Sequence, residues 1–305
     1  MITKSTVLVL GAGASQPFKY PTGFELRQKI IEKLADQNNP AYKLLEQTLF
    51  SSDDISQFQK ALFHSSANNI DEFLENYPSY QDMGKRVIAQ ILVGCEDDQF
   101  MFENSDWYFH LFGEMKRGSS FEGFTENKLA IITFNYDRSL EHYIYTSLKN
   151  FYNKTGDEAA TIMTSIPVIH IYGQIGYLPW QKKTPERSYG NKEEKYLVET
   201  SKLIKVLHEK GDIEKDEALK QAHTLFEAAE KIYFLGFGYH KINLDRLKIN
   251  SLDKSNKGIY GTAKGFTDKE RKQIMSLSNN KIDLNLANAG NLSILQFIRE
   301  HVELV

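Results

Sequence analysis

The chain has 305 residues, of which 41% are hydrophobic and 25% charged, with a formal net charge of -3. These values are ordinary for a soluble globular protein and give no global signal for binding to nucleic acid or to a membrane surface. The single cysteine, Cys95, excludes an intrachain disulfide and a multi-cysteine zinc module. No apolar run approaches the ~20 residues that cross a bilayer, and the start does not read as a signal peptide, so we expect a cytoplasmic protein.

The first motif is a short apolar run, Val7 to Leu10, followed by Gly11-Ala12-Gly13-Ala14-Ser15. A buried strand that ends in close glycines lets the backbone turn tightly and brings N–H groups near a phosphate. The dinucleotide fingerprint needs a third glycine where Gln16 stands, and an acidic residue after a strand where Glu32 lies in a helical pattern. This is therefore not the dehydrogenase fingerprint, and a tight turn without a ligand remains the alternative.

Helical patterns dominate the next hundred residues, and no strand pattern separates them. The expected helices are Phe24 to Leu34, Tyr42 to Phe50, Ile55 to Phe63, a short helix capped by Asn69, and Arg86 to Val93. An aromatic cluster from Phe100 to Phe112 is more typical of a core or a subunit interface than of a ligand site. We interpret 31–125 as a helical module inserted between the first two strands.

The stretch from Leu129 to His142 begins as a strand buried on both faces and then changes abruptly to polar residues. Thr133, Asn135 and Asp137 follow one another before a helix that runs to Phe151. Polar groups just past the carboxyl end of a buried parallel strand face the crevice where ligands bind. The alternative is that Asp137 caps the helix and Asn135 makes a turn.

Two later strands end in similar signals. The expected strand from Ile166 to Ile171 ends in the motif His170-Ile-Tyr-Gly173. The expected strand from Ile232 to Leu235 is followed by Gly236-Phe-Gly238-Tyr-His240. We expect His170 at the site, and we assign no chemistry to His240. The polar segment from Gln181 to Lys195 is expected to be a solvated, mobile loop.

The remaining patterns complete a prediction of one domain over 1–305, an α/β fold with a Rossmann-like parallel sheet, helices on both faces and a large helical insertion. The sheet core is expected to comprise 1–30, 126–178 and 229–305, with a mobile or helical segment at 179–228. The other expected elements are helices at Leu197 to Leu207, Ala218 to Lys231, Asp268 to Leu277 and Leu292 to Val302, and strands at Gly258 to Thr262 and Ile282 to Leu286.

Four strand-end motifs in this order resemble the sirtuin superfamily. The Gly11 to Ser15 turn resembles its first glycine loop, which takes the NAD phosphates. Thr133-Phe-Asn135-Tyr-Asp137 resembles its Thr-x-Asn-x-Asp motif at the nicotinamide riboside end. His170-Ile-Tyr-Gly173 resembles its catalytic histidine segment, and Gly236-Phe-Gly238 falls where the family has a loop at the adenosine side, although only its first glycine matches.

The resemblance implies NAD as substrate. It implies Asn135 and His170 as catalytic residues, and Gly11, Ala12, Gly13, Ser15, Thr133, Asp137, Gly236 and Gly238 as residues that bind NAD. Deacylase sirtuins carry a four-cysteine zinc module that this chain lacks. The large helical insertion is more similar to the sirtuin-like NAD hydrolases of bacterial anti-phage defence, which deplete NAD when activated through a partner.

A stand-alone domain of this size most resembles the one paired with a HerA-type hexameric ATPase, and a short Argonaute is another expected partner. We expect a homo-oligomer that is held inactive alone, gated by the helical module or by the charged segment Gln181 to Lys195. Two alternatives stay open. One is a sirtuin-like ADP-ribosyl transferase or deacylase, and the other is a non-catalytic nucleotide-binding module that helps to assemble a complex.

Overall fold

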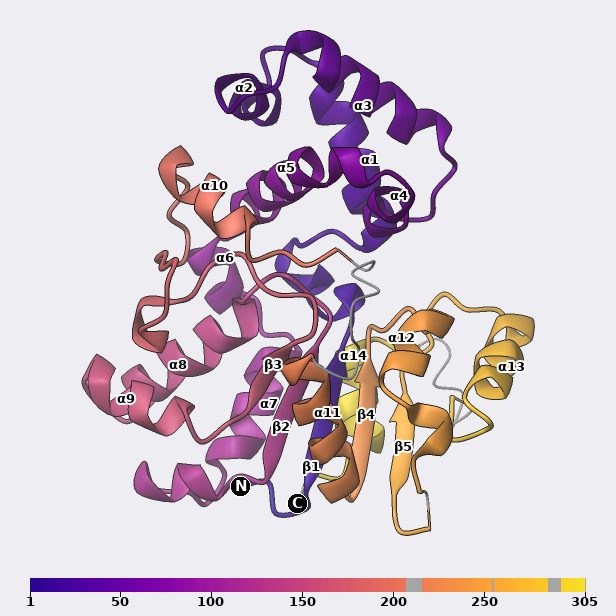
Figure 1. Cartoon of the computed structure of the whole chain (residues 1–305). Coiled ribbons are helices and arrows are strands. Elements are labelled where there is room, and N and C mark those ends of the chain that lie inside the picture. The colour runs from indigo at the N-terminus through magenta and orange to yellow at the C-terminus, as the bar shows by residue number, and fades with distance from the viewer. Residues whose placement is uncertain (207–215, 254, 285–291, 305) are drawn as a thin grey trace.

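The fold is built on a five-stranded, fully parallel sheet with the order β3-β2-β1-β4-β5. The computed structural model of the chain describes residues 1–206, 216–253, 255–284 and 292–304. The strands are β1 (Thr6–Leu10), β2 (Leu129–Thr133), β3 (Val168–His170), β4 (Lys231–Leu235) and β5 (Gly258–Gly261). In Figure 1, α11 crosses in front of the sheet and α14 lies behind it. The predicted α/β fold with a Rossmann-like parallel sheet is confirmed.

The central strands follow from continuous apolar runs. All five residues of β1 and of β2 are buried, as expected where helices cover both faces of a parallel sheet. The sixth expected strand does not form as a strand: Asp283 makes a single parallel bridge to Tyr260. The part of that expected strand beyond Leu284 lies outside the described residues.

The order of the strands creates a switch point beside β1. The chain passes from β1 to β2 and β3 on one side, and then to β4 and β5 on the other side. Connections after β1 and β4 therefore leave the sheet in opposite directions, and a crevice opens between them at the carboxyl ends of the strands. The sheet itself thus fixes where a ligand can bind.

Helices fill the long connection between β1 and β2 and most of the later chain. The helices before β2 are α1 (Gly23–Ala35), α2 (Pro40–Gln47), α3 (Ser52–His64), α4 (Ile70–Asn76), α5 (Gln81–Gly94), α6 (Asp98–Glu103) and α7 (Trp107–Lys116). The later helices are α8 (Ser139–Phe151), α9 (Gly156–Met163), α10 (Glu194–Ser201), α11 (Glu217–Ala228), α12 (Lys241–Arg246), α13 (Asp268–Leu277) and α14 (Ile294–His301).

The insertion between β1 and β2 divides into two parts. Helices α1 to α5 stand together beyond the carboxyl ends of the strands, whereas α7 returns to pack against α8 and α14 beside the sheet (Figure 1). Most of the aromatic cluster on α7 is core, because Trp107, Tyr108 and Phe112 are buried, but Phe109 is 59% exposed. We refer to α1–α5 as the helical cap.

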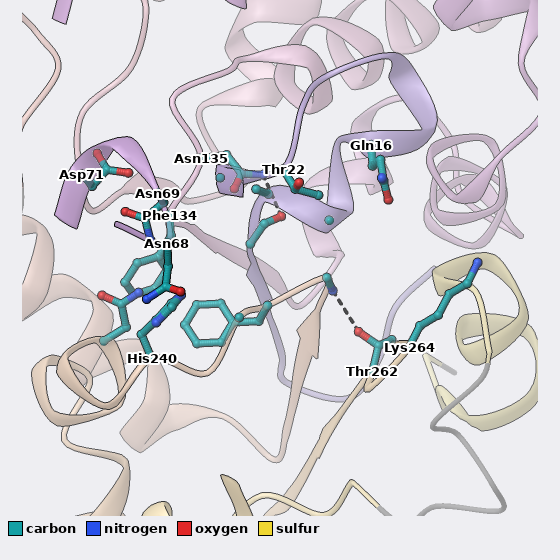
Figure 2. A pocket seen from close by; sticks show the side chains of 18 of the residues that line it. Gln16, Thr22, Asn68, Asn69, Asp71, Phe134, Asn135, His240, Thr262 and Lys264 are labelled. Carbon is teal, nitrogen blue, oxygen red and sulfur yellow. Dashed lines mark hydrogen bonds between the residues drawn. The ribbon is translucent and has the colours of Figure 1, made fainter. Parts of the chain in front are cut away.

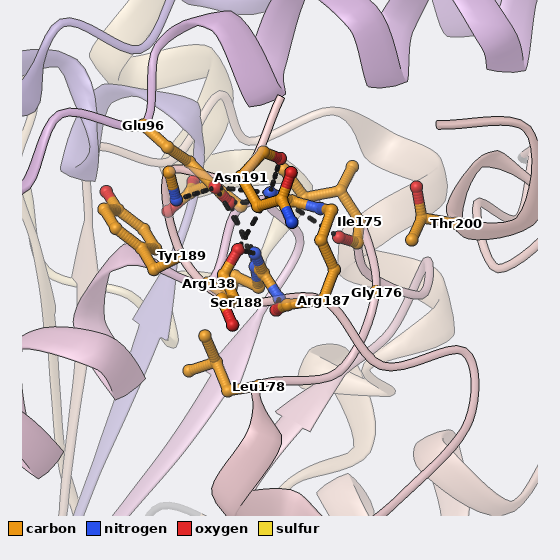
Figure 3. Close-up of polar contacts among 12 residues, drawn as sticks. Glu96, Arg138, Ile175, Gly176, Leu178, Arg187, Ser188, Tyr189, Asn191 and Thr200 are labelled. Carbon is orange, nitrogen blue, oxygen red and sulfur yellow. Dashed lines mark hydrogen bonds and ion pairs between the residues drawn. The ribbon is translucent and has the colours of Figure 1, made fainter. Parts of the chain in front are cut away.

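The segment expected to be a solvated loop is anchored by a fully buried ion cluster, shown in Figure 3. Arg187 donates to both carboxylate oxygens of Glu96 at 2.6 Å, and Arg138 donates to the same carboxylate at 3.0 and 3.3 Å. All three side chains have no exposed surface. The expectation of a solvated segment is therefore wrong at Arg187, because its guanidinium pairs with the buried Glu96 carboxylate and donates its other hydrogen bonds to backbone carbonyls.

The cluster joins three parts of the chain that are distant in sequence. Glu96 follows the cap helix α5, Arg138 precedes α8, and Arg187 belongs to the segment after β3. Both guanidinium groups also donate to carbonyls of this segment, including that of Ser188. Burial alone would raise the pKa of Glu96, but the two arginines outweigh burial and lower it.

Within the described residues no helix is long and apolar enough to cross a membrane.

Replacing Glu96 tests this anchor. Glu96→Gln leaves two buried guanidinium groups without their carboxylate, so the free energy of unfolding should fall by about 3–5 kcal/mol in urea titrations. The pKa of Glu96 is lower folded than unfolded, so its contribution is present above the ordinary glutamate value and is lost as the pH falls. Wild-type stability should therefore decline in acid more steeply than that of the variant.

The control removes a carboxylate from an exposed pair. Glu199 accepts from Lys202 at 2.7 Å with both side chains largely exposed. Glu199→Gln should change the free energy of unfolding by less than about 1 kcal/mol. Equal losses in the two variants would show that the buried cluster does not anchor the segment.

Candidate functional site

A large cavity opens at the switch point, with a volume of about 1190 Å³. Its walls come from the turns after β1 and β4, the residues after β2, helix α4 of the cap, and the starts of α12 and α14 (Figure 2). Ligand cavities commonly span roughly 300–1,000 Å³, so there is room here for a dinucleotide. The sheet and the cap thus enclose the cavity together.

Two glycine turns meet backbone to backbone at the base of the cavity. The N–H of Gly11 donates to the Leu235 carbonyl and that of Gly13 to the Gly236 carbonyl, both at 3.0 Å. A Cβ on Gly11 would lie 2.6 Å from the Gly236 oxygen, and one on Gly236 would lie 2.2 Å from the Ala14 nitrogen. Gly236 also has a φ of 57°, which favours glycine. No larger residue fits these positions without moving one turn.

This contact changes what the first glycine turn can offer to a phosphate. The N–H groups of Gly11 and Gly13 donate to the second turn, and those of Ala14 and Ser15 donate back to the carbonyls of Gly11 and Ala12. Gly11, Ala12 and Gly13 line the cavity, as do Gly236 and Gly238 on the other side. The glycines therefore supply a close backbone surface, and four N–H groups of the Gly11 to Ser15 turn are already bonded within the protein.

Asn135 occupies the cavity wall after β2, with its amide held from behind. Its backbone N–H donates to Thr133 Oγ1 at 3.0 Å. Its Nδ2 donates to the Gly11 carbonyl at 2.9 Å and to Ser15 Oγ at 3.1 Å. Both amide hydrogens are used, and no hydrogen bond to Oδ1 forms among the described residues. The residue is only 9% exposed and lines the cavity, so an unpartnered acceptor faces it.

Ser15 and Asp137 lie behind Asn135 and are not among the cavity-lining residues. Ser15 Oγ donates to Asp137 Oδ2 at 2.7 Å, and Oδ1 accepts from the N–H and the hydroxyl of Ser139. Ser139 Oγ is in turn 2.7 Å from the Tyr108 hydroxyl. Burial raises the pKa of Asp137, while the bonds from Ser139 and Ser15 oppose the rise. In this conformation the two side chains hold Asn135 and the glycine turn in place.

His170 lies at the end of β3 with both ring nitrogens engaged. Nε2 is 2.6 Å from Glu141 Oε1, and Nδ1 is 3.0 Å from the carbonyl oxygen of Asn135. Burial alone would lower its pKa, but the charge and hydrogen bond of Glu141 outweigh burial and raise it. The His170 side chain is 6% exposed and is not among the residues that line the cavity.

Three cavity residues were missed or discounted from the sequence: Asp71 on α4, Tyr172 after β3, and His240 before α12. Tyr172 and His240 lie past the ends of their strands, whereas His170 is the last paired residue of β3 and sits opposite Thr133. The sequence signal for Tyr172 and His240 was their position beyond the end of an expected strand. Asp71 carried none, because it reads as an ordinary acidic residue in a first helical turn.

No protein-family model matches the chain, and a search of curated proteins also finds no match. Among the described residues, no group of three or more His, Cys, Asp or Glu side chains is arranged to hold a metal ion.

The glycine contact can be tested with a matched pair of substitutions. Gly236→Ala adds a methyl group against the first turn at a positive φ, so we expect a loss of at least about 3 kcal/mol in the free energy of unfolding. Gly118 also has a positive φ, 67°, with nothing within 4 Å of an added Cβ. Gly118→Ala should cost only about 1–2 kcal/mol. Urea unfolding measures both, and a similar cost at the two positions would contradict a tight contact between the turns.

Proposed function

We propose that the protein is an NAD hydrolase that cleaves NAD to nicotinamide and ADP-ribose. The observation that carries the proposal is the Asn135 oxygen, an oriented acceptor facing a cavity of dinucleotide size at the switch point of a parallel sheet. The resemblance of the four strand-end motifs to sirtuins names the substrate.

Hydrolysis of the bond between nicotinamide and ribose depends mainly on how the enzyme positions NAD and the attacking water. Breaking the bond between nicotinamide and ribose creates an oxocarbenium-like carbon, as in glycoside hydrolysis, but the leaving group departs neutral and needs no general acid. Water attacks this carbon and loses one proton. Asn135 Oδ1 can accept from that water or from a ribose hydroxyl, and its fixed orientation avoids reorganisation during the reaction.

The two histidines have different parts in this proposal. His240 is exposed and lines the cavity, so we assign to it the acceptance of the proton from water. His170 acts as a positioning residue, because it holds the backbone carbonyl of Asn135 while Glu141 holds the imidazole. The catalytic role expected for His170 thus becomes an indirect one.

The proposal extends to a role as effector of a bacterial anti-phage defence system, activated through a partner such as a HerA-type ATPase or a short Argonaute. Its support is the resemblance together with the position of the cap, since α4 supplies part of the cavity wall. A shift of the cap on oligomer assembly or partner binding would change the cavity directly. The segment Gln181 to Lys195 lines no part of the cavity and is anchored at Arg187, so the cap is the better gate.

A non-catalytic nucleotide-binding module is the second candidate. It is favoured by one observation, namely that four of the N–H groups in the first glycine turn, those of Gly11, Gly13, Ala14 and Ser15, are already bonded within the protein. This candidate predicts NAD binding without release of nicotinamide. The same assay therefore separates it from the hydrolase.

Asn135→Ala tests the carrying observation. The substitution removes the oriented acceptor, so nicotinamide release should fall by a factor of roughly a hundred or more. Release is measured by chromatography with the chain alone and with its genomic neighbour's product, and circular dichroism checks the fold. Turnover close to wild type would remove Asn135 from the reaction.

Substitutions of the two histidines should differ in kind. His240→Ala should reduce kcat by roughly a hundredfold or more with little change in melting temperature, because the side chain is exposed.

His170→Ala should lower the melting temperature, because Glu141 is left buried without its partner. The pKa of His170 is raised on folding, so its stabilising effect is present at low pH and is lost as the pH rises through the folded value. Thermal unfolding from pH 5 to pH 9 should show this loss in wild type and not in His170→Ala; a pH-independent difference would contradict the ion pair.

A further inference from the structure

The cap contributes a carboxylate that is held in the wall of the cavity. Asp71 lies in the first turn of α4, and its Oδ1 accepts a hydrogen bond of 2.5 Å from the Tyr136 hydroxyl. Among the described residues, no hydrogen bond to its Oδ2 forms. Tyr136 is itself buried, so the bond fixes Asp71 against the sheet domain. Figure 2 shows Asp71 on the α4 wall.

Three consecutive residues build the wall next to this carboxylate. The ring of Phe134 lines the cavity and packs edge-on against Phe237 and Tyr172, with centroids 5.0 and 5.3 Å apart. Asn135 presents its unpartnered Oδ1, and Tyr136 orients Asp71. An aromatic face, an amide oxygen and a carboxylate together form a surface that favours a flat cationic ring bearing an amide.

The basic groups of the cavity do not cancel this acidic wall. Lys241 pairs with Asp245 at 2.5 Å. Lys264 lies across the Gly236–Thr262 hydrogen bond from Asp71 in Figure 2. His240, the remaining basic residue among the described residues that line the cavity, lies on the same side as Asp71 in Figure 2. The cavity therefore has carboxylates on the cap and at Asp106, and Lys264 on the other side of the glycine turns from Asp71.

This polarity matches the charges of an oxidised nicotinamide dinucleotide, with phosphates in the middle and a cationic ring at one end. We propose that Asp71, oriented by Tyr136, forms the nicotinamide subsite with Phe134 and Asn135 and selects the oxidised, cationic ring over the reduced, neutral one. The proposal rests on the proposed function for its substrate class. It adds a residue from the cap that the strand-end motifs do not include.

Burial raises the pKa of Asp71, and the Tyr136 hydrogen bond and the charge of His240 oppose this rise only in part. A bound cationic ring acts in the same direction as these two groups, because a nearby opposite charge favours the carboxylate. The reduced ring gives no such benefit.

Binding measurements test the proposal without depending on turnover. The probes are carba-NAD⁺, whose nicotinamide bond is not cleaved, NADH, and ADP-ribose, which lacks the ring. Isothermal titration should show wild type binding carba-NAD⁺ at least roughly tenfold more tightly than NADH. This ratio needs only a small part of the favourable free energy that two opposite charges in contact can supply. Asp71→Asn should reduce that ratio to within about threefold by weakening carba-NAD⁺ alone.

Two further variants separate charge at this wall from general effects. Tyr136→Phe removes the hydrogen bond that favours the carboxylate, so its ratio should fall between those of wild type and Asp71→Asn. Asp53→Asn removes an exposed carboxylate from the first turn of α3 and should keep the wild-type ratio. An unchanged affinity for ADP-ribose shows that each variant is folded.

The outcomes are distinct. An unchanged ratio in Asp71→Asn, an equal loss for all three probes, or no binding of any probe by wild type would overturn the subsite. A ratio that collapses as expected while wild type never releases nicotinamide, with or without its partner, would refute the hydrolase and leave the subsite standing.

Discussion

The contact between the two glycine turns is the constraint on which the rest of the site depends. Because Gly11 and Gly236 lack side chains, β1 and β4 can deliver their following loops to within backbone hydrogen-bonding distance. The Gly11 carbonyl then receives Asn135, and Ser15 connects Asn135 to Asp137. Asn135 is therefore positioned by Gly11, which also lines the cavity, and by Ser15 and Asp137, which lie behind it.

The sheet was predictable because buried parallel strands are continuous apolar runs, and such runs can be recognised without knowing their neighbours. The glycine turns and Asn135 followed, since parallel strands finish at the same edge. Arg187 was not predictable: its segment is as polar as a solvated loop, and its buried partner, the carboxylate of Glu96, is distant in sequence. His170 was expected at the site and His240 was given no chemistry. In the structure His240 lines the cavity and His170 does not, because the pairing of β3 extends as far as His170, which local sequence does not show.

The cap and the sheet each contribute part of the cavity wall. Loops of the sheet supply backbone surfaces and the Asn135 amide, while α4 supplies carboxyl and amide side chains. The Tyr136–Asp71 bond is a direct link between the two parts at the cavity itself. A displacement of the cap would therefore alter both the volume of the cavity and its charge, which would give the proposed regulation by a partner a physical route.

The buried cluster around Glu96 also bears on the order in which the chain acquires its structure. Its bonds join residues 42 and 91 positions apart, so each must wait for distant parts of the chain to be synthesised. The second glycine turn, at Gly236, emerges from the ribosome later still. A nascent chain therefore lacks one wall of the cavity until most of its length is translated, and a site of the proposed kind would be assembled only in a nearly finished molecule.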